Sequence, residues 1–581
     1  MYTSEKGTLC LISLLKAHGV KKVIASPGTT NHVFVASIQS DPWFELYSSV
    51  DERSAAYIAC GMSAESGEPV VITCTGATAS RNYLSGLTEA YYRKLPVIAV
   101  TYNGGIHQKN HLVAQQIDRD SIQKDVARCS INIPIIKDAT DHWLCNVEIN
   151  KALLAVTFNG GGPAHINIST GYSSDFHLTK LPEERVIKRI YADDKFPSLP
   201  DGKTVIFVGS HANFTPEETQ AIDSFCEATD SVVLCDHTSG YYGKFRVQAS
   251  LIGAQKGNDS FKNIRLLIHL GEVSGDYYSM TFPEEVWRVS EDGEIKDTFH
   301  TLTNLFHMNC TQFFSTLNNA VKQEKNMTLL AACKKELEEI MDAIPELPFG
   351  NIWIAKQTAG LIPPKSVVHL GILNSLRSWN FFPFANGVES YCNVGGFGID
   401  GILSTIIGSA IVSPDKKHYA ILGDLAFFYD LNSLGNRHVP ANLRILLINN
   451  GRGTEFTNYN HPCYKFGEKA VPFMAAGGHF GCKSRDLVKN YSENLGFKYL
   501  TADSKKSYLD TIESFLNSDE KQPVVFEVFT NPDDESNALE AVLNIKQNQP
   551  GKNFSLKSAI KESARQILGD KGRRILDIIK E

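Results

Sequence analysis

Apolar positions along the chain alternate between two spacings, one typical of buried strands and one typical of amphipathic helices. Short apolar runs occur at residues 23–25, 69–75 and 96–101, and helical spacing fills the stretches between them, beginning with residues 9–18. Strands that alternate with helices predict parallel sheets with helical crossovers. Further apolar strand runs follow at 205–208, 232–235 and 266–270, and then at 367–370, 419–422 and 443–448. We therefore expect an α/β protein with three doubly wound parallel-sheet domains.

Changes in composition predict where these domains begin and end. Pro182, Pro197 and Pro200 stand among charged residues, which is typical of a linker. The last stretch has apolar residues at 560, 567, 575 and 578, which favours a packed C-terminal helix over a docking helix or a lid. The expected divisions are a first domain (1–180), a linker (181–203), a middle domain (204–320), a helical connector (321–347), a third domain (348–550) and a helical extension (551–581).

Composition and charge narrow the class of protein. With 581 residues, 43% hydrophobic and 21% charged, the chain is long enough for several globular domains. The net charge of −7 and the lack of a Lys/Arg run argue against nucleic acid or a membrane surface as a partner. Neither a signal peptide nor a membrane-spanning run is found, so we expect a cytoplasmic protein. Twelve cysteines without a C-x-x-C pair indicate reduced core thiols rather than a zinc site or a disulfide framework.

The most informative stretch is 419–450, which reads as strand, helix and strand. One apolar run ends at Gly423-Asp424, residues 427–436 have helical spacing, and the next run ends at Asn449-Asn450. In an open parallel sheet, the carboxyl ends of neighbouring strands face one crevice. Asp424, Asn450 and the carbonyl of Arg452 could therefore hold Mg²⁺, which prefers oxygen ligands and keeps positions for phosphate. The alternative is an ordinary crossover with a buried Asp and Asn.

These residues carry a family resemblance. Gly423-Asp424-Leu425, followed some two dozen residues later by Asn449-Asn450, resembles the diphosphate anchor of thiamine diphosphate (ThDP) enzymes. Leu425 stands where Gly is usual in the superfamily, but it matches the SEPHCHC synthases of menaquinone biosynthesis. The resemblance spans the chain to about residue 547, and it implies ThDP and Mg²⁺ as cofactors. It also implies that the first domain binds the pyrimidine ring and the third domain binds the diphosphate.

The resemblance extends to the first domain. Glu52 begins the helix after the second strand, where the family has the glutamate that hydrogen-bonds the pyrimidine ring; such a carboxylic acid needs a nearly dry pocket to share a proton with the ring. Read without the family, Glu52 would be a surface glutamate at a helix start. His165 is expected to be a packed strand residue outside the site. The implied ring contacts are Ser26, Pro27, Gly28, Thr75, Gly76 and Asn82.

Several other residues are candidates for the reacting side of the site. In this branch Gly398 and Ile399 precede a helix, and the aliphatic side chain supports the bent cofactor; a buried core isoleucine would look the same in sequence. Gln116 aligns with a family active-site glutamine, and Glu455 follows Asn450 closely enough to approach the reacting atoms. Polar loop residues that suit a neutral or polyhydroxylated acceptor are Asn31, His32, His107, His111 and Gln115. His107 and His111 could relay protons, although each could equally be a surface residue.

The chain departs from the branch at its cationic positions. SEPHCHC synthases bind a dicarboxylic oxo acid and isochorismate, with arginines and a lysine that can clamp carboxylates. In our alignment those positions hold Thr30, Asn103 or Gly104, Trp379, Val394 and the pair Asp276-Tyr277. A substrate carboxylate facing such residues would be unpaired, so we infer that the menaquinone substrates are not those of this chain. Arg377 and Arg452 remain as possible anion contacts.

The sequence leads to three hypotheses about function. The leading hypothesis is a ThDP- and Mg²⁺-dependent carboligase that decarboxylates a 2-oxo acid and transfers the acyl unit to an unknown small acceptor. A simple 2-oxo acid decarboxylase is the second, and a catalytically silent scaffold with the same fold is the third. The resemblance also implies a homodimer or homotetramer whose sites lie between subunits.

Overall fold

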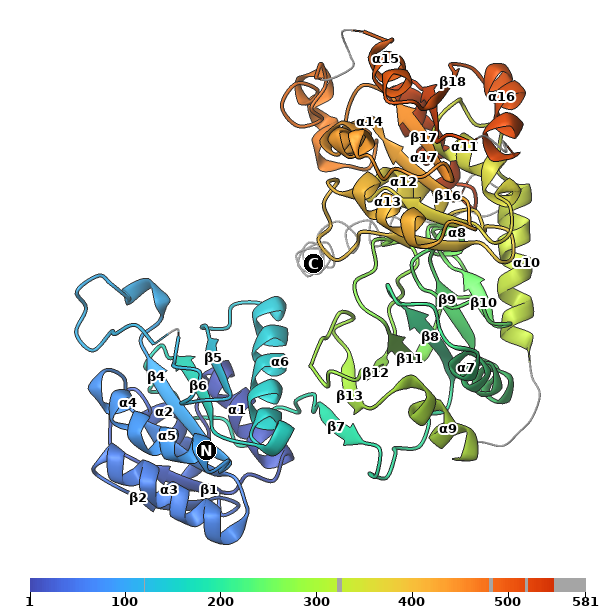
Figure 1. Ribbon diagram of the computed structural model, residues 1–581. Helices are drawn as coiled ribbons and strands as arrows, with labels where there is room; N and C mark the ends of the chain where they lie inside the picture. The colour runs from blue at the N-terminus through green and yellow to red at the C-terminus, as the bar shows by residue number, and fades with distance from the viewer. Residues whose placement is uncertain (120, 321–326, 480–483, 518–520, 548–581) are drawn as a thin grey trace. The chain divides into compact units, whose positions relative to one another are not determined.

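The computed structural model describes residues 1–119, 121–320, 327–479, 484–517 and 521–547 (Figure 1). These residues divide into two compact units. The first contains Met1–Lys195 and Asp292–His307, and the second contains Phe196–Glu291 and the described residues from Met308 onward. The helical extension expected at 551–581 lies outside the described residues. In the described part of the chain, we find no helix with the length and apolar character needed to span a membrane.

The first sheet has six parallel strands in the order β2-β1-β3-β4-β6-β5. Its strands are β1 (Lys22–Ala25), β2 (Glu45–Ser48), β3 (Val70–Cys74), β4 (Val97–Asn103), β5 (Cys129–Ile133) and β6 (Ala164–Ser169). Its helices are α1 (Lys6–Ala17), α2 (His32–Ile38), α3 (Glu52–Ser66), α4 (Thr78–Asn82), α5 (Leu84–Tyr92) and α6 (Ala139–Ala155), with short 3₁₀ turns η1 (Ile106–Gln108) and η2 (Phe158–Gly160).

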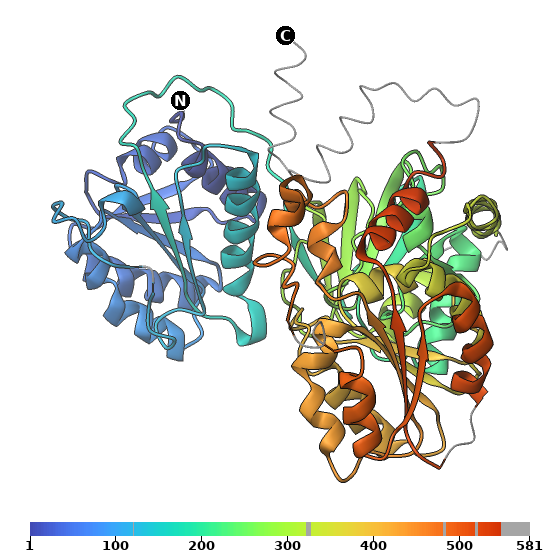
Figure 2. The same cartoon turned by 90° about the horizontal axis from the view of Figure 1, so that it is seen from above.

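Helices cover both faces of this sheet (Figures 1 and 2). On one face, residues of α1, α2 and α6 pack with Val71 and Val100; on the other, residues of α3 and α5 pack with Ile72 and Ala99. Neighbouring residues of one strand point to opposite faces, which explains why both faces are apolar. The near-continuous apolar runs seen in the sequence are thus strands that are buried on both sides.

The second sheet has seven strands in the order β10-β9-β8-β11-β12-β13-β7. Its strands are β7 (Lys188–Tyr191), β8 (Lys203–Val208), β9 (Val232–Cys235), β10 (Arg246–Gln248), β11 (Ile264–Leu270), β12 (Glu285–Val289) and β13 (Leu302–His307). Its helices are α7 (Pro216–Thr229), α8 (Ser250–Gly253) and α9 (Cys310–Ala320), and α10 (Thr328–Asp342) follows. Strand β7 lies within the stretch that was expected to be a linker.

The third sheet again has six parallel strands, in the order β15-β14-β16-β17-β19-β18. Its strands are β14 (Val367–Leu370), β15 (Glu389–Cys392), β16 (His418–Gly423), β17 (Leu443–Asn449), β18 (Lys498–Ala502) and β19 (Val524–Phe529). Its α-helices are α11 (Asn351–Thr358), α12 (Asn374–Trp379), α13 (Ile402–Val412), α14 (Asp424–Tyr429), α15 (Leu487–Asn494), α16 (Lys505–Asn517) and α17 (Pro532–Leu543). Its 3₁₀ segments are η3 (Ala359–Leu361), η4 (Leu431–Gly435), η5 (Thr454–Thr457) and η6 (Pro462–Ala470). Three parallel sheets with flanking helices confirm the predicted fold class.

The helix after β16 differs from the expectation. The spacing predicted one helix over 427–436, whereas α14 begins at Asp424, ends at Tyr429, and is followed by η4. Asp430 interrupts it, because its buried carboxylate accepts hydrogen bonds of 2.6 Å from both the backbone N–H and the hydroxyl of Ser404 in the first turn of α13. A carboxylate that satisfies the N–H groups of another helix overrides local helical spacing.

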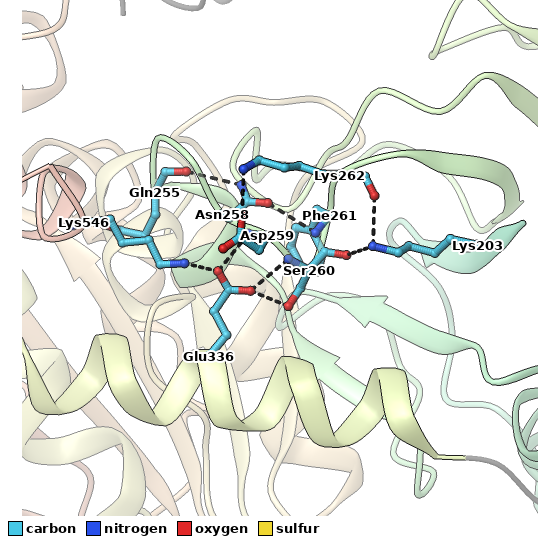
Figure 3. Close-up of polar contacts among 9 residues, drawn as sticks. All are labelled: Lys203, Gln255, Asn258, Asp259, Ser260, Phe261, Lys262, Glu336 and Lys546. Carbon is cyan, nitrogen blue, oxygen red and sulfur yellow. Dashed lines mark hydrogen bonds and ion pairs between the residues drawn. The ribbon is translucent and has the colours of Figure 1, made fainter. Parts of the chain in front are cut away.

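Within the second unit, one buried carboxylate joins three distant stretches of chain (Figure 3). Glu336 of α10 accepts the backbone N–H groups of Asp259 and Ser260 at 3.1 and 3.0 Å, the hydroxyl of Ser260, and the ammonium of Lys546. Burial alone would raise the pKa of Glu336, but the hydrogen bonds from Lys546 and Ser260 outweigh burial and lower it. The loop at 255–262, helix α10 and the end of the described chain are therefore held together by one satisfied polar network.

Candidate active site

Glu52 and Asn82 form a hydrogen-bonded pair in the first unit. Glu52 is the first residue of α3, half-buried, and its N-cap is Asp51, whose side chain accepts from the N–H of Arg53. The amide nitrogen of Asn82, at the end of α4, donates to Oε2 of Glu52 at 3.0 Å. The two candidate ring contacts, 30 residues apart in sequence, thus meet. An amide donor on one oxygen fixes the orientation of the carboxylate.

Two turns in the same unit are joined through one threonine. The hydroxyl of Thr30 lies 2.9 Å from the hydroxyl of Thr75 and accepts from the N–H of Gly76 at 3.2 Å. A Cβ on Gly28 would lie 2.5 Å from Cβ of Thr75, so only glycine allows this approach. The loop of Ser26, Pro27 and Gly28 also lines a cavity of about 480 Å³ between α2 and β2. The two turns expected to contact the ring are therefore neighbours.

Asp424 lies at the carboxyl end of β16, where the sequence predicted it. It follows Gly423 as the first residue of α14, is only 6% exposed, and accepts the N–H of Gly451 at 2.9 Å. Burial raises the pKa of Asp424 to about 6, with backbone N–H groups as its hydrogen-bond donors and Glu527 as a second negative charge nearby. A bound cation would compensate this carboxylate.

Asn450 faces the same crevice, since β16 and β17 are adjacent and Gly423 pairs in register with Ile448. Oδ1 of Asn450 accepts the N–H of Arg452 at 3.3 Å, and its side chain also donates to Glu535. The guanidinium of Arg452 contacts Asp533 at 3.1 Å, so its charge is directed to the surface of α17. The backbone carbonyl is therefore the part of Arg452 that remains a candidate cation ligand.

Glu535 is a site residue that the sequence reasoning missed. It is buried on α17, accepts the N–H of Asn351 at 2.8 Å and the hydroxyl of Thr530 at 2.9 Å, and holds Asn450. Burial raises the pKa of Glu535 to about 7. An acid in the first turn of a helix ordinarily lies at the surface, so its position in sequence gave no signal of this role.

Three further candidates surround the anchor. Gly398 precedes α13 at a point where a Cβ would lie 2.7 Å from a carboxylate oxygen of Asp400. Ile399 is half-buried and packs against the core formed by α13, β16 and β17. Leu425 is half-buried beside Gly453, and a Cβ added to Gly453 would lie 3.3 Å from Cδ1 of Leu425. All three lie in the second unit, on segments next to Asp424 or α13.

Arg377 and Glu455 form an ion pair in the second unit. A guanidinium nitrogen of Arg377 on α12 contacts a carboxylate oxygen of Glu455 on η5, and the side chains are 14% and 19% exposed. The guanidinium also lies over the ring of Tyr277, 4.7 Å from its centroid. Arg377, which the sequence offered as a possible anion contact, therefore already has a carboxylate partner.

The polar loop residues of the first unit do not form one cluster. His107 and His111 are exposed on the segment after β4, as is Gln115, whereas Oε1 of Gln116 accepts the N–H of Gly104 at 3.2 Å. Asn31 donates to the carbonyl of Ser26, and the ring of His32 contacts the carbonyls of Thr29 and Ser173.

Two other residues of this unit, Arg119 and His165, are buried and hydrogen-bonded. Arg119, which the sequence reasoning passed over, is buried beside Gly76 and donates to the carbonyl of Tyr102 at 3.1 Å. His165 lies in β6 between the hydroxyls of Thr101 and Ser130, and burial lowers its pKa to about 3, as expected of a packing residue.

Most positions aligned with the branch's cations hold buried side chains, whereas Tyr277 is 58% exposed and Asn103 is half-buried. Thr30, Asp276, Trp379 and Val394 are each at most 3% exposed. Trp379 donates to Asn351 at 3.0 Å, while Asp276 accepts the N–H of Tyr278 at 2.9 Å and contacts the hydroxyl of Ser250. Burial, with Asp236 nearby, raises the pKa of Asp276 to about 7. These residues belong to the core rather than to an anion-binding surface.

Known proteins resemble this chain over most of its length. Residues 5–123 match the family model described as "Thiamine pyrophosphate enzyme, N-terminal TPP binding domain". The chain is 30% identical over 568 residues to 2-succinyl-5-enolpyruvyl-6-hydroxy-3-cyclohexene-1-carboxylate synthase of Bacteroides fragilis, covering 93% of this chain and 98% of that protein. It belongs to the SEPHCHC synthase family of thiamine diphosphate enzymes.

Other SEPHCHC synthases show similar coverage. The protein of that name from Bacteroides thetaiotaomicron is 29% identical over 565 residues, covering 93% of this chain and 98% of the relative. The one from Flavobacterium johnsoniae is 26% identical over 550 residues, covering 90% and 95%. The residues of this chain fit the cofactor of the family. The carboxylate of Asp424 is buried among N–H groups, and the amide of Asn450 lies beside it. Oxygen ligands of this kind suit a divalent cation that carries a diphosphate.

Proposed function

We propose that this chain is a thiamine diphosphate- and Mg²⁺-dependent carboligase. It would decarboxylate a 2-oxo acid and transfer the acyl unit to an acceptor that carries fewer carboxylates than the substrates of its relatives. When bound, the cofactor supplies the electron sink for the cleavage of the bond to the carboxylate. The observation that carries the substrate part of the proposal is the burial of Thr30, Asp276, Trp379 and Val394 at the aligned cationic positions.

The cofactor-binding part of the proposal assigns roles to the residues of each unit. Asp424, Asn450 and the carbonyl of Arg452 would bind Mg²⁺, and Glu535 would orient Asn450. Gly398, Gly423 and Leu425 would lie along the diphosphate, and Ile399 would support the bent cofactor. In the first unit, Ser26, Pro27, Gly28, Thr75 and Gly76 would contact the ring.

The proton-transfer part rests on Glu52. Asn82 donates to Oε2 of this carboxylate. This hydrogen bond would hold Glu52 in one orientation while Glu52 exchanges a proton with the ring. Gln116 would bind substrate, and His107 and His111 would donate or accept protons from the exposed loop that carries them. Glu52 and Gln116 thus have different proposed roles, and a single substitution can test each of them.

The Arg377–Glu455 pair supports an acceptor with little negative charge. A guanidinium that already contacts a carboxylate must lose that contact before it binds the carboxylate of a substrate, and breaking a largely buried pair costs about 3–5 kcal/mol. Hydroxyl groups, by contrast, can donate to Glu455 and accept from Arg377 while the pair stays intact. A neutral polyhydroxylated acceptor therefore fits these two residues better than a dicarboxylate does.

Product analysis tests the proposal. The protein would be supplied with ThDP, Mg²⁺ and pyruvate or 2-oxobutyrate, with and without neutral polyhydroxylated acceptors, and 2-oxoglutarate with isochorismate would serve as the comparison. We expect CO₂ release and a coupled product with the first set and little product with the second. Release of CO₂ and free aldehyde alone would establish a simple decarboxylase, and efficient coupling to isochorismate would refute the proposed specificity.

Two further parts of the proposal concern assembly and location. We infer a homodimer or homotetramer in which one subunit supplies Glu52 and another supplies Asp424, because relatives of this kind place the cofactor between subunits. We also infer a small-molecule enzyme of the cytoplasm. Calorimetry that detected no Mg²⁺-dependent ThDP binding would contradict a cofactor site between subunits and favour the silent scaffold.

A further inference from the structure

Four side chains with metal-binding atoms meet in the first unit, on the face of the sheet covered by α1 and α6. Cys10 comes from α1, His142 and Cys145 come from α6, and Glu184 comes from the segment before β7. One ligand atom from each of Cys10, His142 and Glu184 lies within 4.8 Å of the other two. The thiol of Cys10 also hydrogen-bonds to the side chains of Cys145 and Glu184. Cys10, His142 and Glu184 therefore form one cluster, and Cys145 joins it through its hydrogen bond to Cys10.

The spacing of Cys10, His142 and Glu184 can be compared with that of a tetrahedral site. A tetrahedron with metal–ligand bonds of about 2.0–2.3 Å has edges of about 3.3–3.8 Å. Nε2 of His142 lies 2.9 Å from Oε1 of Glu184, and Sγ of Cys10 lies within 4.8 Å of a ligand atom of each of these residues. His142 and Cys145 are three residues apart on α6, which places both on one face of the helix.

The charge balance of the cluster suits a bound cation. The Glu184 side chain is 4% exposed and accepts from the amide of Asn146 at 2.9 Å. Among the ion pairs between described residues, its partner is His142, which is charged only when it is protonated. The nearly buried carboxylate of Glu184 thus lies beside a thiol and an imidazole, and none of these groups carries a permanent positive charge. Removing a carboxylate from water without such a partner is unfavourable.

We propose that Cys10, His142, Cys145 and Glu184 form a Zn²⁺ site. Two thiolates, an imidazole and a carboxylate are ligand types that zinc binds, and four protein ligands are typical of structural zinc. The imidazole side chain of His142 is 47% exposed while both cysteines are buried, so an ion can enter from the histidine side. The cysteines lie 135 residues apart in sequence, which explains why no short motif indicated the site.

The position of this zinc site assigns it a structural role. Glu52 begins α3, whose residues pack on the opposite face of the sheet from Cys10 and Cys145. The chain after Glu184 is already bonded to α6, because Asn146 and Asn150 donate to the carbonyl of Arg185 and the N–H of Ile187 donates to Asn150. A bound zinc ion would link α1 to α6 and to Glu184, and it would hold Glu184 in place at the start of the 184–187 segment.

Metal content of the full-length protein tests the proposal directly. The reduced protein would be loaded with Zn²⁺, dialysed and analysed by mass spectrometry, and we expect one zinc ion per chain. His142→Asn is the main variant because its exposed side chain makes misfolding improbable, and it should weaken zinc binding by at least about 100-fold. His177→Asn is the matched control, since His177 also pairs with a carboxylate, Asp175, but the two side chains are 65% and 53% exposed.

The cobalt spectrum of the wild-type protein gives a second test, which does not depend on how the variants fold. Bound to the wild-type protein, Co²⁺ should show thiolate-to-metal charge transfer, which Cys10→Ser or Cys145→Ser should reduce and Cys129→Ser, on β5, should leave unchanged. The proposal would be overturned by zinc content at background level after loading, by equal binding in the His142 and His177 variants, or by a Cys10–Cys145 disulfide in a metal-free protein.

Discussion

Arg377 and Glu455 contact each other through a guanidinium nitrogen and a carboxylate oxygen, and Tyr277 covers the guanidinium. We expect Glu455→Gln to release Arg377 for other anions. Inhibition by a small dicarboxylate such as succinate should then strengthen about 10-fold, because a charge-assisted hydrogen bond contributes about 1.5 kcal/mol. Glu468→Gln is the control, since Glu468 lies 3.7 Å from Arg452 and is 87% exposed. Equal inhibition of both variants would show that Arg377 does not face the substrate.

Glu52→Gln should separate cofactor binding from catalysis. Glutamine is nearly isosteric and can still interact with Asn82, so ThDP affinity should be close to wild type. Turnover should fall by about 10²–10⁴-fold, since the amide cannot exchange the proton. Calorimetry and steady-state kinetics measure the two effects. A variant with unchanged turnover would remove Glu52 from the mechanism.

Asp424→Ala should weaken cofactor binding itself. It removes the one carboxylate among the proposed ligands, and we expect Mg²⁺-dependent ThDP affinity to fall by at least about 100-fold. Asp430→Ala is the comparison, because Asp430 is also buried nearby but binds Ser404 rather than the proposed cation. That variant should lower the unfolding temperature and keep the dependence on Mg²⁺. Wild-type affinity in the Asp424 variant would refute the proposed metal site.

Mixing inactive variants tests the shared site. If one subunit supplies Glu52 and another supplies Asp424, hybrids of Glu52→Gln and Asp424→Ala subunits contain one intact site per dimer. Activity should return to about half of the wild-type value per hybrid dimer after subunit exchange. Native mass spectrometry can count the hybrids. Demonstrated exchange without any recovered activity would exclude a site formed between subunits.

The Glu336–Lys546 pair makes a prediction about stability. Lys546→Met leaves a buried carboxylate without its cation and should destabilise the second unit by about 3–5 kcal/mol, whereas the double variant Glu336→Gln/Lys546→Met should recover most of this loss. Because the pKa of Glu336 is lowered in the folded protein, its contribution is present above its ordinary pKa and is lost as the pH falls below about 4.5.

Unfolding temperatures at pH 4 and pH 7 measure this effect. The wild type should lose more stability than the double variant over that interval, because the unfolded wild-type chain binds a proton at Glu336 more readily than the folded protein does. An identical pH dependence in both proteins would show that the pair contributes nothing measurable to folding.

The sequence predicted the sheets because their strands are apolar runs buried on both faces, and β16 and β17 with Asp424 between them are the clearest case. It failed at Asp430, where a contact with Ser404 ended a helix that local spacing favoured. It also missed Glu535, whose burial depends on the packing of α17, and the pairing of Arg377 with Glu455, which lie 78 residues apart. Local pattern indicates which residues are buried, but long-range polar partners are fixed only by tertiary packing.

The burial of Asp276, Trp379 and Val394 has a consequence for how substrate preference can change during evolution. In the second unit these residues fill the core, so placing an arginine at any of them would force a cation into a packed interior, with a loss of several kcal/mol of stability. Gaining arginine contacts to an anionic substrate at these three positions by successive single substitutions would therefore pass through poorly folded intermediates. The proposed substrate preference would then be protected by folding stability, and neighbouring core positions would have to change before an arginine could be placed at these sites.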